Sequence, residues 1–182
     1  GPILLLDHAD NCGSGGTQDD MTVIAEAMHQ ELEDTAVAAV WDPYAVRVLK
    51  SAGLNAEVTV QLGGRTDMPS IGATGAPLQV SGQVSALSDG NWTVAGPMYT
   101  VVEVSMGPTA VLDTGKMQIV IVSLHREPWD AGVFTSVGID PADKTYLLLK
   151  SRIHYRAGFA NLAQATVICD GRGVTTSDNT VP

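Results

Sequence analysis

Residues 3–33 read ILLLDHADNCGSGGTQDDMTVIAEAMHQELE, and this stretch decides the class of fold. Ile3 to Leu6 form a short apolar run, which is typical of a strand buried on both faces of a parallel sheet. From Met21 to Leu32 the apolar residues recur at three- and four-residue spacing, which predicts an amphipathic helix over about Asp20 to Glu33. The polar, glycine-rich residues between the two predict a strand-to-helix loop.

The same alternation of strand and helix continues beyond residue 33. Val37 to Trp41 predicts a second strand, and Asp42-Pro43 is typical of a helix start, with Asp as the N-cap and Pro at the first helical position. Glu57 to Leu62 alternates as a third strand. From Gly63 onward, short apolar runs separated by tight turns predict an antiparallel meander instead.

The predicted meander strands are Leu78–Leu87, Tyr99–Ser105, Thr109–Leu112 and Met117–Val122. The rest of the chain returns to α/β, with helices near Asp130–Val137 and Tyr155–Gln164 and strands at Tyr146–Leu149 and Thr166–Cys169. The sequence therefore predicts a single α/β domain whose mixed β-sheet has flanking helices and an antiparallel meander insertion.

Composition narrows the class of protein. The chain has 182 residues, 45% of them hydrophobic, which is enough for one domain with a sizeable core. A net charge of −10 argues against nucleic acid and anionic membranes as partners, because both require a basic face. Cys12 and Cys169 cannot make a disulfide framework. No transmembrane stretch or signal peptide is recognised, so a cytoplasmic location is expected. The missing initiator Met suggests that residues 1–182 are one domain of a longer protein.

The loop from Asp7 to Asp19 is the first candidate site. Ligands of open α/β sheets bind beyond the carboxyl ends of strands, and glycines such as Gly13 let the backbone approach a ligand. The loop lacks the Lys-Ser/Thr of a P-loop and strict G-x-G-x-x-G spacing, which disfavours a phosphate site. Asp7 and Asp10 could act as an acid/base pair or as metal ligands. The alternative is a structural loop in which Thr17 or Asp19 caps the helix.

The segment from Lys150 to Arg156 is the second candidate site. Three of the ten basic residues lie within these seven positions, so the segment could hold a carboxylate. The alternative is that these cations only pair with surface acids. Residues 125–130 are interpreted mostly as a helix-entry loop capped by Asp130. No complete catalytic set and no three-ligand metal constellation is recognised in the chain.

Several motifs, in order along the chain, resemble the C-terminal domain of the MlrC (microcystinase C) family of zinc metallopeptidases. They are Asp7-x-Ala9-Asp10-Asn11, Trp41-Asp42-Pro43, Leu62-Gly63-Gly64, Gly96-Pro97-Met98-Tyr99, Gly107–Leu112, Gly138-Ile139-Asp140-Pro141, Lys150-Ser151, His154-x-Arg156-Ala157-x-Phe159 and Thr175-Thr176. The loop departs from the family's Asp-Asn-Pro-Gly-Gly-Gly, because Cys12 and Ser14 replace the Pro and one Gly.

The resemblance implies a zinc hydrolase that cleaves linearised microcystin and the derived tetrapeptide at the Adda–Glu bond. It also implies that a larger N-terminal domain, absent from residues 1–182, holds the zinc, so that this domain has no metal ligand or catalytic residue and is inactive alone. Its role would be to complete an interdomain cleft with that domain and the peptide substrate. The predicted substrate-binding residues are Asp7, Asp10, Asn11, Gly13, Lys150, Ser151, His154 and Arg156.

Two other classes of function stay open on the sequence. One is a stand-alone α/β module that binds a small molecule or an anion through the glycine-rich loop. The other is a structural or dimerisation domain, in which the chain would form a homodimer and the polar edge would have no ligand.

Overall fold

The sheet places the two candidate segments at one edge. A computed structural model describes residues 1–175; residues 176–182, including Thr176 of the last motif, lie outside the described part. The eight-stranded sheet has the order β10-β1-β9-β2-β8-β7-β4-β3. Its parallel part comprises β1 (Ile3–Asp7), β2 (Thr35–Trp41), β8 (Met117–Val122), β9 (Tyr146–Leu149) and β10 (Ala165–Cys169).

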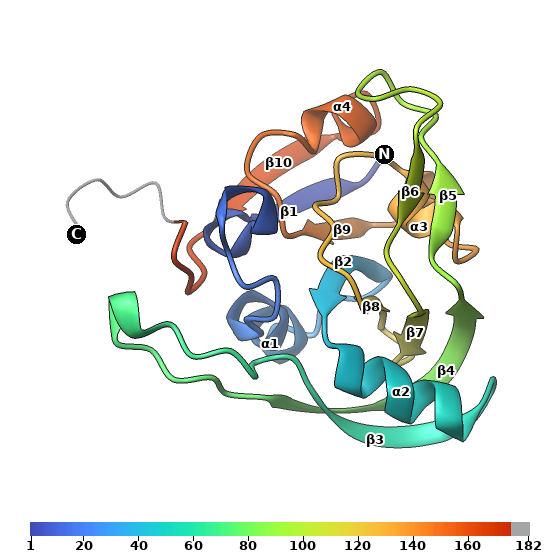
Figure 1. The fold of residues 1–182 in the computed structure, drawn as a ribbon. Coiled ribbons are helices and arrows are strands. Elements are labelled where there is room, and N and C mark those ends of the chain that lie inside the picture. The colour runs from blue at the N-terminus through green and yellow to red at the C-terminus, as the bar shows by residue number, and fades with distance from the viewer. Residues whose placement is uncertain (176–182) are drawn as a thin grey trace.

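Three of the four predicted meander strands, Leu78–Leu87, Thr109–Leu112 and Met117–Val122, pair antiparallel in the same sheet, whereas the strand predicted over Tyr99–Ser105 belongs to a separate two-stranded sheet. β3 (Glu57–Leu62), β4 (Leu78–Ser88) and β7 (Thr109–Asp113) pair antiparallel in succession, and β7 pairs antiparallel with β8. Figure 1 shows β3 and β4 curving past the helix after β2, while the connection between these two strands extends beyond the first helix; β3, β4 and this connection together are called the β3–β4 arm. A mixed α/β sheet with an antiparallel insertion is thus confirmed.

Helices cover one face of the sheet. Helix α1 (Thr22–His29) buries Ile24 and Ala27, and α2 (Pro43–Ala52) buries Val46 and Leu49, against apolar residues of β2 and β8. Asp42 caps α2 by accepting a hydrogen bond from the amide of Ala45 at 2.9 Å, as the Asp-Pro signal predicts.

The other face packs against short elements. These are the hairpin of β5 (Asn91–Thr93) and β6 (Glu103–Ser105), together with α3 (Gly132–Thr135) and α4 (Arg156–Phe159). Phe134 of α3 and Phe159 of α4 meet edge to face in this core, with ring centroids 6.0 Å apart. The remaining elements are the 3₁₀ turns at His8–Asp10, Cys12–Ser14, Pro69–Ile71 and Pro141–Asp143.

Several helices and one strand are shorter than the sequence predicts. The first helix ends at His29, because Glu31 and Asp34 adopt left-handed backbone angles that turn the chain into β2. The helices predicted near Asp130–Val137 and Tyr155–Gln164 are single turns. The strand predicted over Tyr99–Ser105 is only its last three residues, because Tyr99 and Val101 have positive φ in the hairpin loop. No helix among residues 1–175 is long and apolar enough to cross a bilayer.

Candidate functional site

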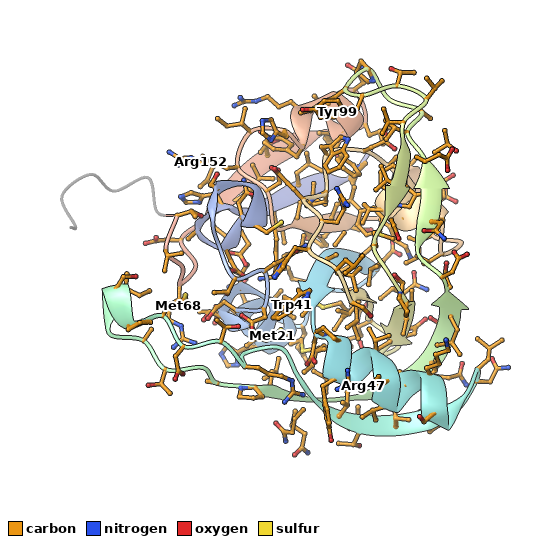
Figure 2. The ribbon with its side chains drawn as sticks, in the orientation of Figure 1. Met21, Trp41, Arg47, Met68, Tyr99 and Arg152 are labelled. Carbon is orange, nitrogen blue, oxygen red and sulfur yellow. The ribbon has the colours of Figure 1, made fainter. Side chains whose placement is uncertain are left out.

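Four parallel strands bring their following residues to one edge of the sheet. Asp7 ends β1, Lys150 follows β9, Trp41 ends β2, and the loop of residues 123–130 follows β8. Since β1, β9, β2 and β8 are adjacent and parallel, these segments meet, as the sequence predicts for the first loop and the Lys150–Arg156 segment. Trp41, the last residue of β2, lies near the centre of Figure 2 and marks this edge of the sheet.

The carboxylate of Asp10 is the centre of the hydrogen bonds that hold the first loop together. Its Oδ1 accepts hydrogen bonds from the amide of Gln18 at 2.7 Å and the hydroxyl of Thr17 at 2.8 Å. Its Oδ2 accepts from the amide of Asp20 at 2.9 Å and from Lys150 Nζ at 2.8 Å. The carboxylate has no exposed surface. Asp10 therefore holds the loop together, and all its contacts are internal.

Lys150 is a buried internal cation. Its Nζ donates to Asp7 Oδ2 at 2.7 Å, Asp10 Oδ2 at 2.8 Å and the carbonyl of Asp20 at 2.6 Å. Burial alone would lower the pKa of Lys150, but the two carboxylates outweigh burial and raise this pKa. An ammonium group has three hydrogens, and all three are donated to protein oxygens. In this structure Lys150 has no hydrogen left for a substrate carboxylate.

Asp7 is the less satisfied partner of Lys150. Its Oδ1 is buried without a hydrogen-bond partner among the described residues. Burial raises the pKa of Asp7, an effect that the charge of Lys150 only partly offsets. One ammonium cannot neutralise two carboxylates, and Asp10 has the larger share of donors. The pKa of Asp7 is therefore raised even though Lys150 lies beside it.

Glu127 joins three strand-end segments and was missed by the sequence analysis. Its Oε1 accepts from Asn11 Nδ2 at 3.1 Å and from Ser151 Oγ at 2.7 Å, and its Oε2 lies 2.9 Å from His154 Nδ1. Only 7% of Glu127 is exposed. The amide of Gly13 in turn donates to Asn11 Oδ1 at 2.8 Å. A lone Glu before Pro at a strand end was the only sequence signal.

The predicted site residues thus separate into two layers. Asp7, Asp10 and Lys150 form a fully buried ion cluster, whereas four others gather around Glu127, with Asn11 and Ser151 buried and Gly13 and His154 exposed. The His154 side chain is half exposed, at 50%. Arg156 is exposed at the start of α4, and its guanidinium lies 5.6 Å from the centroid of the Tyr155 ring.

Gln18 and His125 border this cluster. The buried Gln18 side chain accepts from the Arg126 amide at 3.0 Å and donates to the Arg126 carbonyl at 2.6 Å, which pins the loop after β8 to the first loop. The His125 ring stacks on Trp41 with centroids 4.2 Å apart. Burial lowers the pKa of His125, which favours its neutral form.

The first loop is also tied to the β3–β4 arm. Asp19 Oδ2 accepts from the amides of Arg65 at 2.8 Å and Thr66 at 3.0 Å, so it does not cap α1. Arg65 Nε pairs with Asp42 Oδ2 at 2.9 Å. Within residues 1–175, no group of three or more His, Cys, Asp or Glu side chains could hold a metal ion.

A mainly apolar hollow of about 850 Å³ lies elsewhere, between α1, β10 and the residues before β4. Leu5, Met21 and Val167 are among its lining residues, but neither Glu127 nor His154 is. The polar chemistry and the large hollow are therefore different features of the molecule.

Comparison with known proteins assigns the family. Residues 5–180 match the family model described as "MlrC C-terminus". Microcystinase C of Sphingomonas sp. is 26% identical over 169 residues, a match that covers 91% of this chain and 31% of that protein. A crystal structure of a protein from Mesorhizobium sp. BNC1, assigned as a metallopeptidase, is 26% identical with a TM-score of 0.81. This match covers 96% of the present chain and 34% of the Mesorhizobium chain. The chain thus spans about a third of these relatives, and it belongs to the family of MlrC C-terminal domains.

Proposed function

We propose that this chain is the C-terminal domain of a zinc-dependent metallopeptidase and that it supplies one wall of the substrate cleft. The proposal is supported by the two relatives, one named a microcystinase and the other assigned as a metallopeptidase. Both are about three times as long as the matched segment. The additional length would contain the N-terminal domain that holds the zinc.

The observation that carries the proposal is the polar layer around Glu127. Three strand ends converge there and leave the imidazole of His154 half exposed, and Arg156, two residues further along the chain, is exposed at the start of α4. Among residues 1–175, Asp7 and Asp10 do not fit a zinc ion, because Lys150 and backbone amides already saturate Asp10, and Lys150 pairs with Asp7. The chain's own contribution would be to bind and orient the peptide.

Six of the eight predicted site residues take a specific part in this proposal. Arg156 would hold a carboxylate of the substrate, since a guanidinium presents a fork of donors that matches it. Asn11 and Gly13 would shape the wall of the cleft through their contacts with Glu127 and with each other. Asp7, Asp10 and Lys150 would support this wall from the inside. The proposed substrates are linearised microcystin and its tetrapeptide product, cleaved at the Adda–Glu bond.

The test compares the isolated chain with the intact protein that carries it. We expect the intact protein to contain zinc and to hydrolyse the two peptides, and the isolated chain to be inactive. In the intact protein, Arg156→Ala should raise KM for a carboxylate-bearing peptide at least tenfold. Arg47→Ala is the matched control, because Arg47 lies on α2, away from this edge (Figure 2). Zinc-dependent hydrolysis by the isolated chain would contradict the proposal.

Self-association is a second candidate role, favoured by the edge strand β10. Residues 165–169 contain no charge and no Pro, and Val167 and Ile168 are 47% and 69% exposed. Such an unprotected edge is a template for pairing with another strand. Sedimentation of the isolated chain would show a concentration-dependent dimer that Ile168→Lys abolishes if this role holds, and a monomer in both cases if it does not.

A further inference from the structure

Glu127 is held from three sides in a fixed position. Asn11, Ser151 and His154 each contact its carboxylate, and they come from the loops after β1 and β9. Ser151 Oγ accepts a hydrogen bond from the amide of Tyr155 at 3.2 Å, so its own hydrogen is directed to Glu127. A methyl group on Gly13 would collide with Glu127 Oε2, which shows how closely the loop backbone packs against the carboxylate.

This arrangement sets the proton position on His154. An ionised carboxylate only accepts hydrogen bonds, so the contact at 2.9 Å requires the hydrogen on Nδ1 of His154. In the neutral ring the lone pair then lies on Nε2, on the opposite side from Glu127. Since half of the His154 side chain is exposed, a ligand at this edge can reach the ring.

The contacts differ from those of a serine nucleophile. Ser151 is buried, and its hydroxyl donates to Glu127 instead of to a histidine. His154 is the member of this cluster that combines a titratable ring, a carboxylate behind it and an exposed edge. A carboxylate behind an imidazole fixes its orientation and stabilises the imidazolium that forms when the ring takes up a proton.

We propose that His154 transfers a proton in peptide hydrolysis and that Glu127 is the positioning residue that fixes its Nδ1–H tautomer. The inference rests on the peptidase function proposed above. Nε2 takes a proton from water as the water oxygen bonds to the scissile carbonyl carbon and the carbonyl π electrons move to oxygen. Nε2 then gives this proton to the amine nitrogen as the C–N bond breaks and the carbonyl re-forms.

The first test needs no activity. Long-range ¹H–¹⁵N correlation spectra of the ¹⁵N-histidine-labelled chain distinguish a protonated ring nitrogen from a bare one, and His154→Asn identifies the signal. We expect neutral His154 to be mainly the Nδ1–H tautomer in the wild type and to shift toward Nε2–H in Glu127→Ala. The matched control is Glu57→Ala on the exposed edge strand β3, which should leave the signal unchanged. A wild-type spectrum dominated by Nε2–H would overturn the role of Glu127.

The second test separates proton transfer from substrate binding in the intact protein. Proton transfer by a positioned side chain contributes about 10²–10⁴-fold to a rate. His154→Gln should therefore lower kcat about a hundredfold or more with KM within about threefold, and Glu127→Gln should lower kcat by about tenfold. His29→Gln is the matched control, because His29 is exposed at the end of α1.

The outcomes separate this inference from the proposed function. If the wild-type protein hydrolyses peptides and His154→Gln raises KM without lowering kcat, His154 only binds substrate and the inference is overturned. If the wild-type protein hydrolyses no peptide, the peptidase proposal fails together with the proton-transfer step, while the spectra still decide whether Glu127 fixes the tautomer.

Discussion

Replacing Lys150 with Met tests whether the buried ion cluster holds the site together. Met keeps most of the side-chain volume, so the change removes the ammonium without opening a large cavity. The carboxylates of Asp7 and Asp10 then remain buried without the cation that now lies 2.7 and 2.8 Å from them. Breaking a buried pair in this way costs about 3–5 kcal/mol, because it leaves an uncompensated buried charge.

The size of this cost can be measured by urea unfolding. With a slope of about 2 kcal/mol per molar urea, the midpoint should fall by about 1.5–2.5 M. The control is Lys116→Met, because Lys116 contacts Glu31 and Glu33 in solvent and should leave the midpoint unchanged. A total stability of about 5–15 kcal/mol is typical of a domain, so a domain at the lower end of this range would lose most of its stability in the Lys150 variant.

A double variant keeps the reasoning testable if Lys150→Met does not fold. Asp7→Asn removes one of the two uncompensated charges, so Lys150→Met with Asp7→Asn should be more stable than Lys150→Met alone. The reasoning would be refuted if Lys150→Met lost less than about 1 kcal/mol, which is in the range of an exposed pair. It would also be refuted if the double variant were no more stable than the single one.

Three further predictions concern neighbouring residues. Because the pKa of Asp7 is raised in the folded state, the contribution of Asp7 to stability falls as pH rises from about 4 through that pKa. Asp7→Asn should therefore gain stability relative to the wild type over this pH range. A loss of stability would contradict the raised pKa. Burial, and then the charge of Glu127, raise the pKa of Cys12 to about 12. At pH 8 Cys12 should therefore alkylate about a thousandfold more slowly than a free thiol, and a rate within tenfold of that thiol would contradict this. Gly63 has φ +58°, and a Cβ there would lie 2.5 Å from the carbonyl oxygen of Asp19. Gly63→Ala should therefore destabilise the domain by more than Gly138→Ala, which has open space and costs only the roughly 1–2 kcal/mol of backbone strain. Equal losses of unfolding free energy in the two variants would argue against the collision.

The elements with a strong local signal were predicted correctly. Asp42-Pro43 starts α2 because the cap and the fixed proline φ act within a few residues. The apolar runs of β1 and β9 were recognised as strands, because a parallel strand that is buried on both faces needs apolar side chains at consecutive positions. The lengths of helices α3 and α4 were overestimated. Their apolar residues pack against the sheet from single turns, and hydrophobic periodicity alone does not reveal such a tertiary arrangement.

The candidate site was predicted in its position and only partly in its chemistry. Parallel strand order brings the ends of β1 and β9 together, so Lys150 and Asp10 were expected at one edge. Their mutual contact, which removes the ammonium from the surface, depends on an exact register between segments 140 residues apart. Glu127 follows a strand whose neighbours in the sheet are set by the whole topology, so no local pattern pointed to it.

By itself, the sequence determined the class of fold and the edge of the sheet at which polar groups gather. Hydrophobic periodicity and turn residues act over short distances, and they suffice to order strands and helices. Only the tertiary structure decided which charges neutralise one another and which stay exposed. Burial and proximity set these pairings: Lys150 becomes an internal counter-ion for Asp7 and Asp10, whereas Glu127 presents the ring of His154 at the surface.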